Sequence, residues 1–120
     1  MNIPLMLEQI KKHPDFSKAG MVLCHNGVVR ATSREGKPVT GLMIQVDHDR
    51  LAQILGEQKS TPGIVEILVH IQEGKHLAVG EDVMFLVVAG DIRETVIKTL
   101  TDTLNLIKSQ VTQKTQFFTE

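Results

Sequence analysis

The chain has 120 residues, of which 42% are hydrophobic and 22% are charged, and its formal net charge is −1 at pH 7. These values are typical of a single globular domain, here spanning residues 1–120, with its own hydrophobic core, and they argue against extensive disorder. The balanced charge and the lack of Trp and Tyr also argue against a nucleic-acid-binding protein, which would need a basic surface and side chains that stack on bases.

Three features bear on where the protein is located. No apolar run approaches the roughly 18 residues of a membrane-spanning helix, and the first residues do not resemble a signal peptide, because their apolar stretch is short and lysines follow it. The only cysteine, Cys24, cannot form a disulfide within the chain, as expected in a reducing compartment. Because Cys24 lies in the apolar run AGMVLCHNGVV, we expect a buried, unreactive thiol. We therefore predict a cytoplasmic protein without a membrane partner.

Apolar periodicity predicts the elements of the first half of the chain. Residues 3–12 have apolar side chains at helical spacing and a proline near the start, which indicates a short helix. Residues 20–30 are rich in β-formers but contain Asn26–Gly27, which marks either a tight turn or a bulge within one strand. A polar loop with Gly and Pro follows, and after it come a strand at 39–48 and a helix at 47–60 with an aspartate as its cap.

The second half predicts an α+β fold. Residues 64–73 have the pattern of a strand, and residues 83–90 are continuously apolar, as in a central strand buried on both faces. A long helix at 91–111 follows, and the Thr- and Phe-rich residues 112–120 are assigned to a final strand. The resulting order, α-β-β-α-β-β-α-β, is not a regular βαβ alternation. It favours an α+β fold with a mixed or antiparallel sheet and a long C-terminal helix.

The long helix begins with a clear capping pattern. Asp91 is a suitable N-cap, and Glu94, three residues later, completes a capping box. One stripe of the helix is apolar and is expected to face the core. Its members are Ile92, Val96, Leu100, Leu104, Ile107 and Val111.

Most classes of catalytic motif are absent from the sequence. The histidines have no metal-ligand spacing, and the chain contains neither a phosphate-binding glycine loop nor a serine-nucleophile motif. His25 and His70 lie in strand-like runs, and we interpret them as hydrogen-bonded core or interface residues rather than catalysts. The sequence therefore predicts neither a metal nor a cofactor.

The basic residues are more informative. Arg30 directly follows a β-rich run and precedes a loop with further cations. Arg93 lies in the first turn of the long helix and, at about 100° per residue, falls within the apolar stripe. A cation at a helix N-terminus opposes the helix dipole, so an anionic group is expected near it. That group is either the carboxylate of a salt bridge, within or between chains, or a ligand.

Two lysines lie near the end of the same helix. Lys108 is in its last turn and Lys114 is in the final predicted strand. A lysine at a helix C-terminus is favoured by the dipole, so an ordinary structural role and a chemical role both remain open from the residues alone.

Several short motifs, in their order, resemble the large, catalytic subunit of molybdopterin synthase. They are AGMVLCHNGVVR, GKPVTGLMIQVDHDRLAQIL, ILVHIQEG, LAVGEDVMFLVVAG and an Arg-started helix that ends in LIKSQV. The resemblance spans residues 18–115, and the chain looks like a divergent member of that family. It implies an α/β-hammerhead fold with an additional antiparallel subdomain, and subunits that pair as a homodimer.

The resemblance also implies an activity. Family members bind a small ubiquitin-like sulfur-carrier subunit and transfer sulfur from its C-terminal thiocarboxylate to cyclic pyranopterin monophosphate, forming molybdopterin. Carried over by position, Lys108 and Lys114 would be the catalytic residues, and Arg30 and Arg93 would bind substrate. This fits their chemistry, because Arg binds phosphate and carboxylate in a bidentate manner, and a Lys near other cations can lose its proton.

The sequence departs from the family pattern at two functional positions. Ile92 stands where the family has a histidine before the helix arginine, and Thr115 stands where it has the second catalytic lysine. Lys114 is one residue away, a shift that reverses the face of a strand. The alternative is therefore a non-catalytic paralogue that binds a carrier tail or an anionic small ligand. A weaker alternative is a purely structural dimer, in which a buried carboxylate would pair with Arg93.

Overall fold

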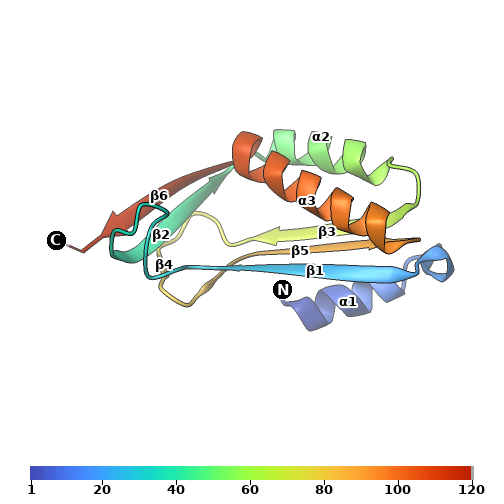
Figure 1. Ribbon diagram of the computed structural model, residues 1–120, viewed down its shortest axis with the longest axis horizontal. Coiled ribbons are helices and arrows are strands. Elements are labelled where there is room, and N and C mark those ends of the chain that lie inside the picture. Colours follow the sequence, from blue (N-terminus) through green and yellow to red (C-terminus); the bar gives the residue numbers. More distant parts are fainter. Residues whose placement is uncertain (120) are drawn as a thin grey trace.

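The computed structural model describes residues 1–119, which form two three-stranded antiparallel sheets and three α-helices (Figure 1). The α+β class predicted from the sequence is confirmed, and the predicted order of elements agrees with the structure except for one additional short strand, β4 (Leu77–Ala78). The molecule is elongated, about 52 Å along its longest axis. The helices are α1 (Ile3–Lys11), α2 (His48–Lys59) and α3 (Arg93–Gln110), and a short 3-10 turn spans Phe16–Lys18. The strands are β1 (Met21–Val28), β2 (Val39–Val46), β3 (Ile64–Ile71), β4 (Leu77–Ala78), β5 (Asp82–Gly90) and β6 (Thr112–Phe118).

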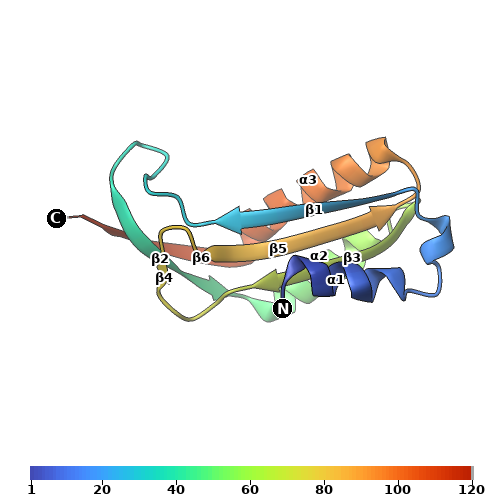
Figure 2. The same cartoon turned by 90° about the horizontal axis from the view of Figure 1, so that it is seen from below.

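The larger sheet has the order β1-β5-β3, with β5 in the centre. Residues 84–90 of β5 are all buried, as the continuous apolar run predicts, because β5 is paired on both edges and covered on both faces. Helix α1 lies on one face, and α2 and α3 lie on the other (Figures 1 and 2). Met6 and Ile10 of α1 pack against Phe85 and Val87, and the opposite face packs against α3 through Leu86.

Strand β1 is continuous through Asn26–Gly27. Its pairing with β5 shifts register between Gly27 and Val28, so the structure confirms the bulge and not the turn. After the bulge, the backbone N–H of Val29 donates to the carbonyl of Glu81 at 2.9 Å. Val29 is only 2% exposed, and it therefore fixes the point at which the chain leaves the larger sheet.

The smaller sheet has the order β4-β2-β6 and lies at one end of the molecule (Figure 1). The final strand expected from the Thr- and Phe-rich C-terminal segment is confirmed as β6, which pairs antiparallel with β2. Strand β4 lies in a segment that the sequence pattern indicated only as a connection. Its Leu77 is fully buried against Leu42 and Ile44 of β2, so one apolar residue is enough to hold this short strand on the sheet.

The predicted start of the long helix is wrong by one residue. Helix α3 begins at Arg93 with Ile92 as the N-cap, and no side chain caps it. Asp91 lies outside the helix: its Oδ1 accepts from the Ile92 N–H at 2.7 Å, and its own N–H donates to the Gly63 carbonyl at 2.9 Å. Glu94 contacts Arg93 instead of closing a capping box. Asp91 therefore ties the end of β5 to the start of β3.

The buried stripe of α3 differs from the predicted one at its start. Val96, Leu100, Ile107 and Val111 are buried, and Leu104 is partly buried. Ile92 is 55% exposed because it precedes the helix. Two threonines that apolar periodicity does not identify also belong to the stripe. They are Thr99 and Thr103, and the Thr103 hydroxyl accepts a hydrogen bond from Gln58 of α2 at 3.1 Å.

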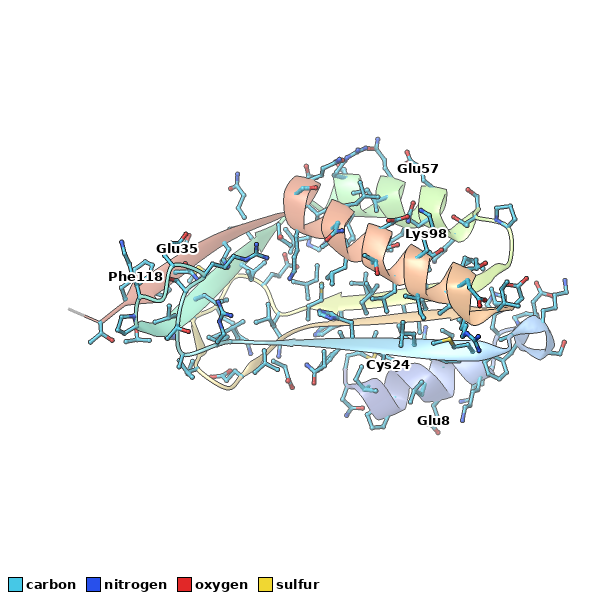
Figure 3. All side chains as sticks on the ribbon, in the orientation of Figure 1. Glu8, Cys24, Glu35, Glu57, Lys98 and Phe118 are labelled. Atoms are coloured by element: carbon cyan, nitrogen blue, oxygen red, sulfur yellow. The ribbon has the colours of Figure 1, made fainter. Side chains whose placement is uncertain are left out.

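The prediction that Cys24 is buried is also wrong. Its side chain is exposed, and partial burial raises the pKa of its thiol. Strand β1 is an edge strand, and α1 packs over β5 and β3 rather than over the middle of β1. Figure 3 shows Cys24 on the β1 ribbon. Within residues 1–119, no helix is long and apolar enough to cross a membrane.

Gly41 tests the packing between β2 and β4, and Gly56 in α2 is a control. A Cβ at Gly41 would lie 2.5 Å from the Leu77 carbonyl oxygen, so we predict that Gly41→Ala lowers the free energy of unfolding by about 1–3 kcal/mol. A Cβ at Gly56 in α2 would meet nothing within 4 Å beyond its own turn of helix, so Gly56→Ala is expected to raise that free energy by about 0.5–1 kcal/mol. Chemical denaturation measures both, and a Gly41→Ala variant as stable as wild type would contradict the close packing of β2 and β4.

Candidate functional site

The two sheets and the end of α3 enclose a cavity of about 520 Å³. Its apolar wall comes from both sheets and includes Leu42, Ile44 and Met84. Its polar wall comes from β1, the loop that follows β1, the last turn of α3, and β6. The cavity therefore depends on how the smaller sheet is attached to the larger one.

The charged residues of the cavity wall are all cationic. Arg30, Arg34, Lys108 and Lys114 line it, together with His25. Of the described residues that form the wall, none is Asp or Glu. Because no carboxylate lies in the described wall, these cations give the cavity a positive potential that favours an anionic ligand. Three of the four residues that the sequence singled out are thus brought together.

Lys108 is held in place by the residues around it on α3. Ile107 is fully buried beside Ile54 and Met84. Lys108, the next residue, is exposed to solvent and lines the cavity. Near the same helix end, the Arg50 guanidinium of α2 donates to the Gln110 side-chain carbonyl. These contacts restrict the last turn of α3 and therefore the position of Lys108.

Lys114 faces the cavity because of the alternation of β6. Thr112, Lys114 and Gln116 line the wall, as expected for every second residue of a strand. Thr115, between two of them, pairs with Met43 and points to the other face. The resemblance places the second family lysine at Thr115, but the structure puts the side chain of Lys114, and not that of Thr115, on the cavity side.

Arg30 and Arg34 belong to the segment that leaves β1. Arg30 follows the buried Val29, and its Nε donates to the Thr32 carbonyl at 2.9 Å. This hydrogen bond orients the guanidinium and does not use its two terminal nitrogens. The loop is closed by a bridge between Thr32 and Pro38. From the sequence, Arg34 was expected only to be a cation of this loop. The sequence feature that could have placed it in the site is its position shortly after Arg30.

Arg93 does not lie where the helical pattern predicts. Its side chain is 78% exposed and contacts Glu94, with 3.3 Å between Nε and Oε1, and it does not line the cavity. Helical periodicity predicts the direction of a side chain but not whether another element packs against it. Arg93 is the first residue of α3, and its side chain stays exposed there. Because Lys108 is fifteen residues further along, the two positions are about 22 Å apart along the helix axis. Arg93 and Lys108 of one chain therefore do not converge.

His25 is a cavity residue that the sequence interpretation missed. It was expected to be hydrogen-bonded in a core or interface, but it lines the cavity. Partial burial, and then the positive charge of Lys108, lower the pKa of its imidazole below the ordinary 6.5. The available signal was alternation along β1, because residues 21 and 23 pack toward α3 and residue 25 shares their face. His70, the other strand histidine, stacks on Phe85 with 6.3 Å between ring centroids.

The loop carboxylate nearest to these cations is ionised more readily than usual. The pKa of Glu35 is lowered, first by a hydrogen bond from its own backbone amide and then by the Ser33 hydroxyl, with smaller contributions from Lys37 and Lys114. Glu35 is exposed and does not belong to the cavity wall. The two labelled residues Glu35 and Phe118 lie at the same end of the molecule (Figure 3).

The fold agrees with the comparisons with known proteins. The family model described as MoaE protein matches residues 2–110. The chain belongs to the MoaE protein family. This membership confirms the resemblance seen in the sequence motifs and places the chain in molybdenum cofactor biosynthesis. Among curated proteins, the sequence comparison finds no match.

Solved structures have the same fold at low sequence identity. Molybdopterin synthase from Staphylococcus aureus is similar with a TM-score of 0.72 and 20% identity, over 86% of this chain and 77% of that chain. Molybdopterin cofactor biosynthesis protein E from Burkholderia multivorans gives 0.77 and 18%, over 99% and 86%. A complex of subunits 1 and 2 of the molybdopterin-converting factor from Helicobacter pylori gives 0.71 and 14%, over 100% and 85%.

The coupling between Lys108 and His25 can be measured by NMR titration. We predict that Lys108→Met raises the pKa of His25, because it removes one of the two causes that lower it, but leaves it below 6.5 because burial remains. Lys98→Met is the matched control: Lys98 lies on the same helix, is exposed, and contacts Asp102 at 2.6 Å. Equal His25 titration curves in the two variants would contradict the proximity of Lys108 to His25.

Proposed function

We propose that this protein transfers sulfur from the C-terminal thiocarboxylate of a small ubiquitin-like carrier to cyclic pyranopterin monophosphate, forming molybdopterin. The observation that carries the proposal is the joint presence of Lys108, Lys114 and Arg30 in the wall of one cavity. Each came from the resemblance as a functional position, and they lie on three different structural segments. No cofactor or metal is needed for this assignment.

The charge of the cavity fits both reactants. The pterin precursor carries a cyclic phosphate, and the carrier brings a negatively charged thiocarboxylate. The planar guanidinium of Arg30 suits bidentate contact with phosphate. In this proposal Lys108 and Lys114 hold the thiocarboxylate against the pterin and supply or accept protons while its sulfur replaces an oxygen substituent on a pterin carbon. Water then hydrolyses the resulting thioester, which releases the carrier as a carboxylate and leaves the sulfur on the pterin. Each carrier contributes one sulfur, so two carriers are consumed for each molybdopterin.

The carrier subunit is a proposed partner. The Helicobacter pylori structure is described as a protein–protein complex of subunits 1 and 2, and this chain aligns with it over its whole length, which supports an equivalent complex here. A flexible carrier tail would have to enter beside β6 and the loop after β1, because those segments carry the cations of the wall.

Arg93 requires a second copy of the chain if it is to bind substrate. It is exposed and distant from Lys108 of its own chain. We propose a homodimer in which Arg93 of one subunit approaches the cavity of the other. Its contact with Glu94 is exposed and therefore weak, so this contact would not prevent Arg93 from engaging an anion.

A non-catalytic binding role is the second candidate, and Ile92 favours it. This residue replaces the family histidine, and it is 55% exposed with no polar group to offer. Such a protein would keep the basic cavity and bind a carrier tail or an anionic small molecule without turnover.

Molybdopterin formation tests the proposed reaction. Purified protein is mixed with thiocarboxylated carrier and cyclic pyranopterin monophosphate, and product is quantified for wild type, Lys108→Ala and Lys114→Ala. We expect product from wild type and at least a roughly hundredfold loss in Lys108→Ala, because a positioned proton-transfer group contributes about 10²–10⁴-fold. Thr115→Ala is the control for Lys114→Ala and should retain activity. Carrier binding without product from wild type would establish the non-catalytic alternative.

Mixed dimers test the role of Arg93. If Arg93 serves the cavity of the other subunit, Lys108→Ala and Arg93→Ala chains are each inactive alone. A random mixture should regain about a quarter of wild-type activity, because half of the dimers are mixed and each has one intact site. The mixture is refolded or co-expressed so that subunits exchange. No recovery would show that Arg93 does not act across a dimer interface.

A further inference from the structure

His25 is the histidine of the cavity wall, and the proposed function gives it no task. It lies on β1 opposite Leu86 of β5, and like Leu23 and Met21 it is on the face of the strand turned toward α3. Its ring reaches along the strand toward Gly27, where a Cβ would lie 3.4 Å from Nε2. The imidazole therefore lies beside the backbone of Gly27 and lines the cavity.

The surroundings of His25 disfavour its protonated form while the cavity is empty. Partial burial and the charge of Lys108 both lower its pKa. The neighbours from β5 are apolar, and the other titratable groups of the described wall are cations from the loop and from β6: Arg30, Arg34 and Lys114. The nearby Asp82 accepts a hydrogen bond from Asn26 at 3.1 Å and does not line the cavity. No acidic side chain of the described wall therefore offsets the cations. Glu35, an exposed residue of the loop outside the wall, interacts with Lys114 and Lys37.

An anion in the cavity reverses this balance. A negative charge among the cations screens Lys108 from His25 and attracts a proton to the imidazole. We propose that His25 takes up a proton when an anion occupies the basic cavity and thereby becomes an additional cationic contact for that ligand. The proposal rests on the proposed function only in that the ligand is anionic. It goes further in assigning a binding role to a residue that the resemblance did not mark.

Linkage determines how affinity then depends on pH. Because the bound anion raises the pKa of His25, the protonated protein binds the anion more tightly than the neutral one by the same factor. Affinity therefore increases as pH falls from above the pKa of the bound state to below that of the free state. A ligand whose own charge is constant over this range is needed to observe the effect, and inorganic sulfate remains a dianion throughout.

The experiment is an NMR titration of the histidine ring protons of the full-length protein, with and without saturating sodium sulfate, at ionic strength matched with sodium chloride. We expect sulfate to raise the pKa of His25 by about one unit, which corresponds to roughly tenfold tighter binding to the protonated form. His13, which contacts Glu66 at 3.9 Å and does not line the cavity, is the internal control and should shift little.

A variant gives a second, independent reading. His25→Gln should bind sulfate with an affinity that no longer changes between pH 8 and pH 5.5, whereas His13→Gln should keep the wild-type dependence. Sulfate that binds wild type at the cavity without shifting His25, or a pH dependence that persists in His25→Gln, would overturn this inference and leave the proposed function intact. If sulfate does not perturb the cavity residues at either pH, the anion-binding character of the cavity is wrong, and the proposed function fails with it.

Discussion

The direct junction between α3 and β6 is the constraint on which the site depends. Only Val111 separates the helix from the strand, and it is 4% exposed. Its N–H donates to the Ile107 carbonyl at 3.0 Å, and its own carbonyl accepts from Asp47 at 2.9 Å. Because its backbone N–H and carbonyl are both hydrogen-bonded and its side chain is in the core, Val111 is held in one position. The helix end and the strand start are therefore fixed relative to each other.

The two lysines follow from that junction. Lys108 precedes it on a helix whose neighbouring residue Ile107 is in the core, and Lys114 follows it on a strand whose register is set by pairing with β2. Successive side chains are about 100° apart around a helix but alternate between the two faces of a strand. Lys108 at the end of the helix and Lys114 in the strand can therefore both line the cavity. The two ammonium groups repel each other across this space, and an anionic ligand between them would relieve that repulsion.

The fold was largely predictable because its signals are local. The apolar run of β5 and the amphipathic pattern of α3 depend on neighbouring residues, and the structure confirms both. Errors arose where a nearby element had to be known. Cys24 is exposed because α1 does not reach it, and Arg93 is exposed because α3 begins there.

The site was less predictable, since residues from separate segments form it. The positions of Lys108 and Arg30 came from family resemblance, and spacing alone would have left them as ordinary cations. Whether Lys114 or Thr115 faces the cavity depends on the register of β6 against β2, in which Lys114 is opposite Ile44. His25 joins the site only because β1 passes beneath the end of α3, a long-range arrangement that no short window of sequence contains.

The central claim is that the α3–β6 junction brings Lys108 and Lys114 together on an anion. A crystal structure of the protein grown with inorganic pyrophosphate tests it most directly. We expect pyrophosphate in the cavity, with the ammonium groups of both lysines within hydrogen-bonding distance of its oxygens. An empty cavity with both lysines turned toward solvent, or pyrophosphate bound only elsewhere, would contradict it.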